Sequence, residues 1–193
     1  KMSKKWILPN KYYYYSYNVE KNCEADFFVM DTNINMMTFK EKNLQLKCLI
    51  EQINKSKAKW KILYGHHPWR SLGGHGHAED YLESYFKKLM NSTNNKIDLY
   101  MCGHDHNKQY LEIGLLVNKQ IVKIPLVVCG TGGKIERFDA PEIKNCKKND
   151  YVIEFFATTL GFLCVKIDNN ILELFFFDAS GKNIEFRKTI KKN

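Results

Sequence analysis

The sequence has no C-x-x-C cysteine pair, no P-loop and no long apolar run. Its six cysteines are widely spaced, which excludes a zinc ribbon and a thioredoxin-like redox motif. The segment GTGGK at residues 130–134 is not a nucleotide-binding loop, because Val128 stands at the first glycine position and no Ser or Thr follows Lys134. The longest apolar stretch, residues 155–167, is shorter than a membrane span, so membrane contact is not evident in this chain.

Arginine-rich tracts and the aromatic signature of RNA-binding sheets are also missing. The 193 residues carry a formal net charge of +9, which suggests an anionic partner. The lysines, however, occur among many asparagines and isoleucines, a mixture that base-composition bias also produces. We interpret the charge as a solvated lysine-rich surface and expect no nucleic-acid partner. A hydrophobic content of 44% in a chain of this length predicts one folded domain.

Hydrophobic periodicity predicts alternating strands and helices, followed by strands alone. Thr38 and Glu41 form a capping-box pattern at the start of the first helix. This order of elements indicates an α/β unit joined to an antiparallel sheet. The cysteines that lie in apolar runs are expected to be buried, namely Cys102, Cys129 and Cys164. Strands are expected at residues 12–17, 26–32, 60–64, 97–102, 109–116, 121–129, 151–157, 163–167 and 172–177, and helices after Thr38 and over 78–90.

The six histidines of the chain all lie between His66 and His106. In the segments YGHHP and CGHDH a buried strand ends, a glycine permits a sharp turn, and a histidine follows. Ligands bind at the carboxyl ends of strands in open α/β sheets, so we expect His66, His104 and His106 to converge there.

Two interpretations of these histidines compete. Each histidine could cap its strand by a hydrogen bond. An H-x-H pair together with a third imidazole at an equivalent strand end instead favours a site for one or two metal ions. Neutral imidazole suits Zn, Fe, Ni or Cu, and suits Mg or Ca poorly. We interpret His67 and His77 as loop residues beside this site.

These segments resemble one known family, in order, along nearly the whole chain. FVMDT is similar to the family's central strand, LQLKCLIEQI to its amphipathic helix, GHHPWRSLGGHG to its G-H-x-P block and CGHDHNKQYL to its G-H-x-H block. GFLCVKID and FFFDASGK are similar to its closing hairpin. The chain therefore resembles the C-terminal half of a calcineurin-like metallophosphoesterase of the purple acid phosphatase type, near its tartrate-resistant branch. The resemblance implies an α/β fold, a four-layer α/β/β/α sandwich, with residues 1–193 as the C-terminal part of a single domain.

The resemblance also implies a role for each matching histidine. His66 and His104 would bind a divalent metal ion, and His106 would bind the other ion, which in this family is often ferric iron. The implied cofactors are thus two metal ions, Fe together with a divalent Fe, Zn or Mn ion. His75 would stand near the phosphate-ester substrate and assist protonation of the leaving group. The resemblance favours a location in the secretory or endomembrane system. The residues themselves indicate no compartment.

Three metal-binding blocks of the family do not occur in this chain: Asp-x-Gly, Gly-Asp-x-x-Tyr and Gly-Asn-His-Asp/Glu. We therefore expect the N-terminal half of the same domain as a partner. Alone, the fragment is expected to be inactive, with unpaired strand edges and exposed core. With both halves, the implied function is dinuclear-metal hydrolysis of phosphate monoesters by a metal-activated hydroxide. The alternatives are a non-catalytic scaffold on the same fold, and a phosphodiesterase or nuclease.

Overall fold

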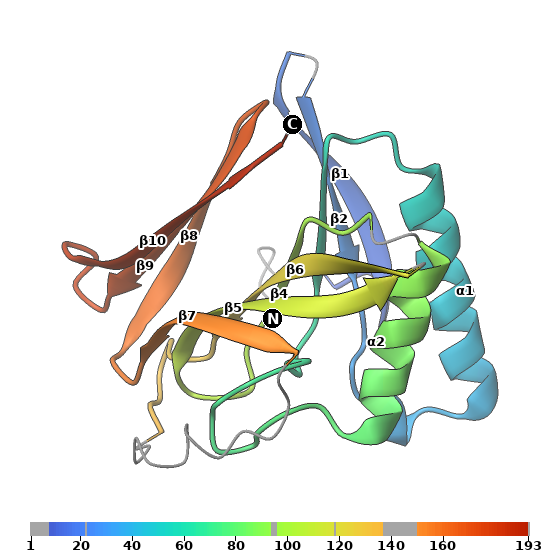
Figure 1. The fold of residues 1–193 in the computed structure, drawn as a ribbon, viewed down its shortest axis with the longest axis horizontal. Coiled ribbons are helices and arrows are strands. Elements are labelled where there is room, and N and C mark those ends of the chain that lie inside the picture. Colours follow the sequence, from blue (N-terminus) through green and yellow to red (C-terminus); the bar gives the residue numbers. More distant parts are fainter. Residues whose placement is uncertain (1–7, 22, 94–95, 118, 137–149, 193) are drawn as a thin grey trace, which may run out of the picture.

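The residues that the structure describes form two β-sheets and two α-helices (Figure 1). The computed structural model describes residues 8–21, 23–93, 96–117, 119–136 and 150–192. The larger sheet has seven strands in the order β1-β2-β3-β4-β6-β5-β7, and the smaller sheet has three in the order β10-β9-β8. The elements are β1 (Tyr13–Glu20), β2 (Cys23–Val29), the short 3-10 helix η1 (Ile34–Met36), α1 (Phe39–Lys55), β3 (Trp60–Tyr64), α2 (Asp80–Ser92), β4 (Leu99–Cys102), β5 (Lys108–Val117), β6 (Gln120–Cys129), β7 (Tyr151–Ala157), β8 (Gly161–Ile167), β9 (Ile171–Asp178) and β10 (Ile184–Lys191).

The first helix begins at the predicted capping box. The backbone N–H of Glu41 donates to Oγ1 of Thr38 at 3.3 Å, and the backbone N–H of Thr38 donates to Oε2 of Glu41 at 2.8 Å. These bonds satisfy N–H groups that have no partner within a helical turn. Leu46, Leu49 and Ile53 recur at helical spacing and form the buried face of α1. The prediction for this helix is confirmed.

The helices and the smaller sheet cover opposite faces of the seven-stranded sheet (Figure 1). Successive residues of a strand point to opposite faces, so neighbours in β3 enter different cores. Leu63 packs in the core that contains Leu49 and Phe86 of the helices. Ile62 packs in the core that contains Leu174 of the smaller sheet. The described residues therefore form helix, sheet and sheet layers, three of the four layers of the expected α/β/β/α sandwich.

Strands β2, β3, β4 and β6 are parallel, which brings their carboxyl ends to one edge of the sheet. The turns after β3 and β4 are joined by backbone hydrogen bonds. The N–H of Gly65 donates to the carbonyl of Met101, and the N–H of Gly103 donates to the carbonyl of His66, both at 3.1 Å. The two Gly-His segments therefore lie side by side.

The prediction that Cys164 is buried is wrong. It lies in β8 and is exposed, because the alternate residues Leu163 and Val165 are the ones that pack against the core between the sheets. Cys102 is buried as predicted, and Cys129 is half-buried. In the described ranges, neither α1 nor any other helix combines the length and apolar character that a membrane crossing requires.

Candidate metal centre

The site lies where the turns after β3 and β4 meet. Nδ1 of His104 and Nε2 of His66 are 3.0 Å apart. These two imidazoles converge as the sequence predicts, each one residue after the glycine that follows its strand. His67 joins them, and one ring nitrogen from each of the three histidines lies within 4.8 Å of the other two. Within the described residues this group contains imidazoles alone.

Burial favours the neutral form of two of these rings, His67 and His104. Desolvation, followed by the neighbouring His66, lowers the pKa of His67 below its ordinary value of 6.5. Desolvation, followed by His67 and His75, lowers the pKa of His104 in the same way. Neutral imidazole is the form that binds a metal ion, so the lowered pKa of His104 favours its role as a metal ligand.

Thr32 fixes the tautomer of His67. Its hydroxyl oxygen accepts the backbone N–H groups of His66 at 3.3 Å and His67 at 3.0 Å. Both acceptor positions of the hydroxyl are then filled, so its proton is donated to Nδ1 of His67, 2.7 Å away. The ring proton of neutral His67 is therefore on Nε2, and His67 presents a hydrogen-bond donor to the site. This tautomer favours the interpretation of His67 as a residue beside the ligand set.

The backbone of His104 is left-handed, with φ 69°. A non-glycine residue in this region is strained, and such strain concentrates at functional sites. The sequence led us to expect a sharp turn after the glycine that follows β4, and the chain does bend there. The residue with the positive φ in this turn is His104, not Gly103. The turn re-aims the imidazole of His104 towards His66.

The structure does not include His106 in the three-histidine group. Its backbone carbonyl accepts the N–H of Glu136 at 2.9 Å. Its ring Nδ1 is buried and has no hydrogen-bond partner among the residues that the structure describes. A buried polar atom without a hydrogen-bond partner lowers stability by roughly 1–3 kcal/mol, so we expect Nδ1 of His106 to have a further partner. The assignment of His106 as a ligand of the second ion stays a prediction.

The residues present fit a metal ion. Two nitrogen ligands of one ion, each about 2.0–2.1 Å from it, are separated by roughly 2.9–3.4 Å in octahedral or tetrahedral geometry. The 3.0 Å between the nitrogens of His66 and His104 lies in this range. The donor set of neutral imidazoles suits Fe and Zn better than Mg or Ca.

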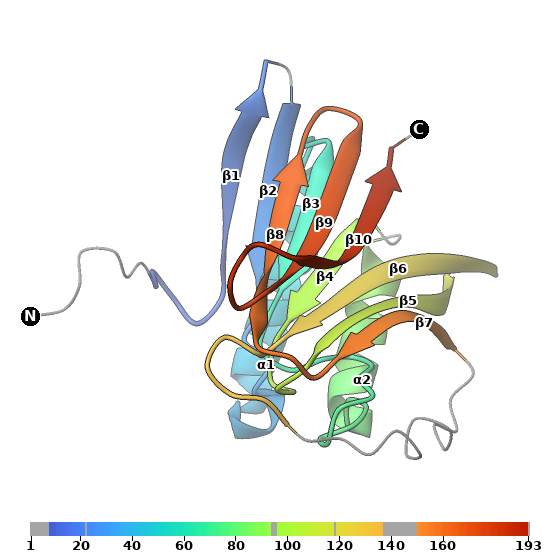
Figure 2. The same ribbon diagram turned by 90° about the vertical axis from the view of Figure 1, so that its left-hand side faces the viewer.

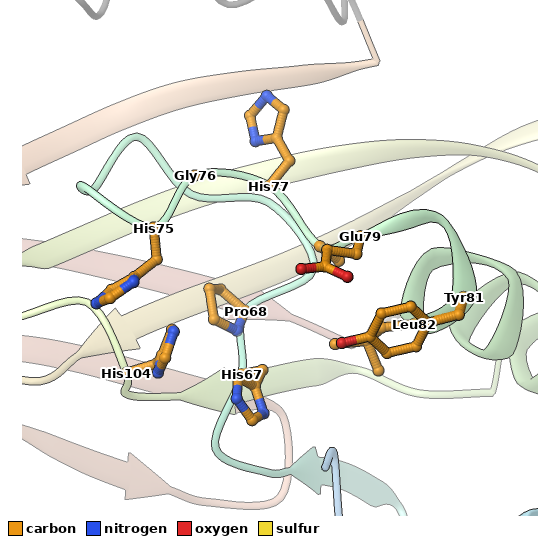
Figure 3. A pocket seen from close by; sticks show the side chains of 10 residues that line it. His67, Pro68, His75, Gly76, His77, Glu79, Tyr81, Leu82 and His104 are labelled. Carbon is orange, nitrogen blue, oxygen red and sulfur yellow. The ribbon is translucent and has the colours of Figure 1, made fainter. Parts of the chain in front are cut away.

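His75 lies in the loop between β3 and α2, beside His104. Its ring is 4.2 Å from that of His104, between centroids, with an interplanar angle of 37°. Its Nε2 is 3.8 Å from Oε1 of Glu136. His75, His104 and His67 line a cavity of about 190 Å³ that extends to Tyr81 at the start of α2 (Figure 3). His75 therefore borders the space that a substrate beside the cluster would occupy.

His77 has a structural role in the loop that it shares with His75. Its Nδ1 accepts the backbone N–H of Ser71 at 3.3 Å. Its ring packs edge-on against Tyr151, with centroids 5.1 Å apart. These contacts agree with its interpretation as a loop residue.

Comparison with known proteins identifies the family. The model of the calcineurin-like phosphoesterase family matches residues 3–108, more than half of the chain. The chain belongs to this family. The matched range includes all six histidines and ends two residues after His106. The resemblance stated from the sequence motifs is thereby confirmed.

Several calcineurin-like relatives are purple acid phosphatases. Purple acid phosphatase 4 of Arabidopsis thaliana is 33% identical over 143 residues, which cover 72% of this chain and 37% of that protein. Tartrate-resistant acid phosphatase type 5 of Sus scrofa is 28% identical over 206 residues, covering 95% of this chain and 56% of that protein. The chain thus spans only about half the length of these curated relatives.

Another relative is named for a different role. Glideosome-associated protein 50 of Plasmodium falciparum is 26% identical over 213 residues, covering 97% of this chain and 49% of that protein. A solved structure of GAP50, described as the anchor in the inner membrane complex of Plasmodium, superposes with a TM-score of 0.76 at 24% identity, covering 98% of this chain and 57% of that one. A purple acid phosphatase from yellow lupin superposes with a TM-score of 0.69 at 20% identity, covering 96% and 34%. These two structures establish the fold.

Three residues of the site were not predicted from the sequence: Thr32, Asp105 and Glu136. Thr32 belongs to the FVMDT segment and Asp105 to H-D-H, so both had a motif as a signal. Glu136 had none.

Proposed function

We propose that the full-length protein hydrolyses phosphate monoesters at a centre of two metal ions. In this proposal His66 and His104 bind one ion, and His106 binds the other. The observation that carries it is the 3.0 Å approach of the imidazole nitrogens of His66 and His104 at the carboxyl ends of β3 and β4. An ion of iron with a second ion of Fe, Zn or Mn matches this nitrogen donor set.

The side chains around the cluster have complementary roles. Bound metal ions would lower the pKa of a water and offset the charge that develops on phosphorus. His67 donates its Nε2–H to a phosphoryl oxygen, since Thr32 occupies its Nδ1. His75 donates a proton to the leaving oxygen, and its Nε2 lies 3.8 Å from Oε1 of Glu136.

We further propose that the N-terminal half of the same domain supplies carboxylate ligands to the centre. The relatives are about twice as long as this chain, which supports a larger domain. An apolar hollow near the cluster also supports it. The hollow lies on the face of the seven-stranded sheet that also packs against the smaller sheet. It extends as far as Tyr15 of β1, the edge strand of the seven-stranded sheet (Figure 2). Its lining residues are Tyr15, Phe27, Tyr64, Gly65, Met101, Cys102, Gly103 and Cys129.

The test is metal analysis together with turnover of p-nitrophenyl phosphate. The His106→Ala variant of the full-length protein should lose one metal ion. Its turnover should fall by more than about 100-fold, beyond the usual cost of changing a residue that only supports a ligand. Lys182→Ala, in the distant β9–β10 turn, is the control and should keep both. Full turnover of His106→Ala with both ions bound would remove the assignment.

A non-catalytic scaffold is the second candidate. It is favoured by the similarity to glideosome-associated protein 50, which extends over 97% of the chain. A scaffold would show no metal-dependent turnover, even if it bound a structural ion. The same assay therefore separates the two candidates. Comparing monoester with diester substrates separates the phosphatase from a phosphodiesterase or nuclease.

A further inference from the structure

The middle residue of the H-D-H segment is a carboxylate with no exposed surface. Asp105 lies between two histidines of the site and is fully buried. Burial of a carboxylate is costly unless its oxygens are hydrogen-bonded. We propose that Asp105 is a positioning residue that fixes the loop carrying His75 to the turn carrying His104. The proposal rests on the proposed function for the role of His75, but the positioning itself can be measured without activity.

Both carboxylate oxygens of Asp105 accept hydrogen bonds from the His75 loop. Oδ1 accepts the backbone N–H of His75 at 3.1 Å, and Oδ2 accepts the hydroxyl of Ser71. The backbone N–H of Asp105 donates to the carbonyl of Gly103 at 2.9 Å, within its own turn. One side chain therefore connects two segments that carry site histidines. The rings of His75 and His104 lie 4.2 Å apart between centroids (Figure 3), and we infer that this connection holds them there.

The neighbouring bonds fix the direction of the Ser71 contact. Oγ of Ser71 accepts the N–H of Gly73 at 2.9 Å and the Nε2 group of Gln109 at 2.8 Å. The orientation of the Gln109 amide is set by its Oε1, which accepts the N–H of Leu72 at 2.9 Å. With both acceptor positions filled, the Ser71 hydroxyl can only donate to Asp105. Both oxygens of Asp105 must therefore act as acceptors. A carboxylate has two such oxygens, whereas an amide has only one.

Two glycines make room for this contact. A Cβ at Gly73 would lie 2.2 Å from Cγ of Asp105, and a Cβ at Gly130 would lie 2.2 Å from its carbonyl oxygen. Neither glycine has a positive φ, so their role here is close approach. A side chain at either glycine would therefore displace Asp105 from this contact.

Asp105→Asn is the sharpest test, because asparagine keeps the shape but has only one acceptor oxygen. Whichever way the amide turns, its NH₂ group faces either the N–H of His75 or the filled hydroxyl of Ser71. In the full-length protein, we expect hydrogen exchange of the His75 amide, followed by NMR, to become about tenfold faster, as for one lost hydrogen bond. The control Asp178→Asn, in the β9–β10 turn, should leave this exchange unchanged.

Turnover of p-nitrophenyl phosphate supplies a second readout. Asp105→Asn should lower kcat by on the order of 10- to 100-fold, the cost of misplacing a catalytic group by about 1 Å. KM and metal content should change little. In a His75→Ala background the same substitution should have no further effect, because Asp105 acts through His75. A general structural role would lower kcat in both backgrounds.

Unchanged exchange of the His75 amide in Asp105→Asn would overturn the proposal, and so would an equal loss of kcat in both backgrounds. If the wild-type protein has no turnover, the proposed function fails and the exchange measurement alone decides the positioning. If Asp105→Asn does not fold, Ser71→Ala takes its place. It removes the donor to Oδ2 and should raise His75 exchange and lower kcat by smaller factors. No change in His75 exchange would then refute the positioning.

Discussion

The most stringent stability test is Arg70→Met, which removes a buried guanidinium from the His75 loop. Arg70 has no exposed surface. Its Nε and Nη2 bond Asp150 at 3.0 and 2.6 Å, and its Nη1 and Nη2 bond Glu83, both at 3.1 Å. The remaining N–H donates to the carbonyl of Trp69 at 3.1 Å. All five N–H donors of the guanidinium are thus used, and they join the His75 loop to α2 and to the residue that precedes β7.

The size of the stability loss depends on the partners that Glu83 and Asp150 keep after the substitution. Removing one partner of a buried ion pair costs about 3–5 kcal/mol. Glu83 keeps an ion pair with Lys87 at 2.7 Å, and the Asp150 side chain is 35% exposed and can be hydrated. Both features reduce the penalty, so we expect the lower end of that range, about 3 kcal/mol.

Equilibrium urea unfolding of the full-length protein measures this loss. The control is Lys55→Met, which removes an exposed ion pair with Glu51 at 2.6 Å and should lower stability far less, because exposed ion pairs contribute little. A loss for Arg70→Met no larger than that of the control would refute the reasoning.

Burial alone would raise the pKa of Asp150, but the bonds and charge of Arg70 outweigh it, and the net pKa lies below the ordinary 3.8. This contribution to stability is present above pH 3.8 and is lost as the pH falls through the lowered pKa.

Two further predictions concern the histidine cluster and the first helix. In metal-free protein, the pKa values of His67 and His104 are lower in the folded state than the ordinary value of 6.5. Just below pH 6.5 the unfolded state therefore binds more protons than the folded state. The free energy of unfolding should fall as the pH drops below that value. Urea midpoints measured from about pH 8 to about pH 5 check this, and a constant midpoint would contradict it. Thr38→Ala should cost about 1 kcal/mol in urea unfolding, because the N–H of Glu41 loses its cap. Lys40→Ala is the control, and equal losses for the two variants would contradict the capping role.

Much of the fold could be predicted from the sequence because its elements have strong local signals. The helix after Thr38 has a capping box and a periodic apolar face, and β3 is a short apolar run that ends at a glycine. Strand β10 was not predicted. It is an edge strand of the smaller sheet with the sequence IEFRKTIK, and its charged residues weaken the hydrophobic signal. Cys164 was misassigned for a related reason, since an apolar run does not reveal which face of a strand is covered.

The site was predictable only in part. His66 and His104 could be found because each follows a strand and a glycine, and parallel strands end at the same edge. The contacts that orient the rings join residues far apart in the chain. Thr32 bonds His67 across 35 positions, and Asp105 bonds the His75 amide across 30. Such bonds depend on the packing of loops, which periodicity and spacing do not encode.

The two Gly-His turns look equivalent in the sequence, yet their glycines have different physical roles. A Cβ at Gly65 would lie 2.6 Å from Cγ2 of Thr32, so this glycine lets the turn approach the threonine that orients His67. A Cβ at Gly103 would meet nothing closer than 3.8 Å, and the left-handed residue there is His104. The first turn therefore places its histidines by close packing, and the second by backbone strain. The common Gly-His pattern arises because both solutions bring an imidazole to the same edge of the sheet.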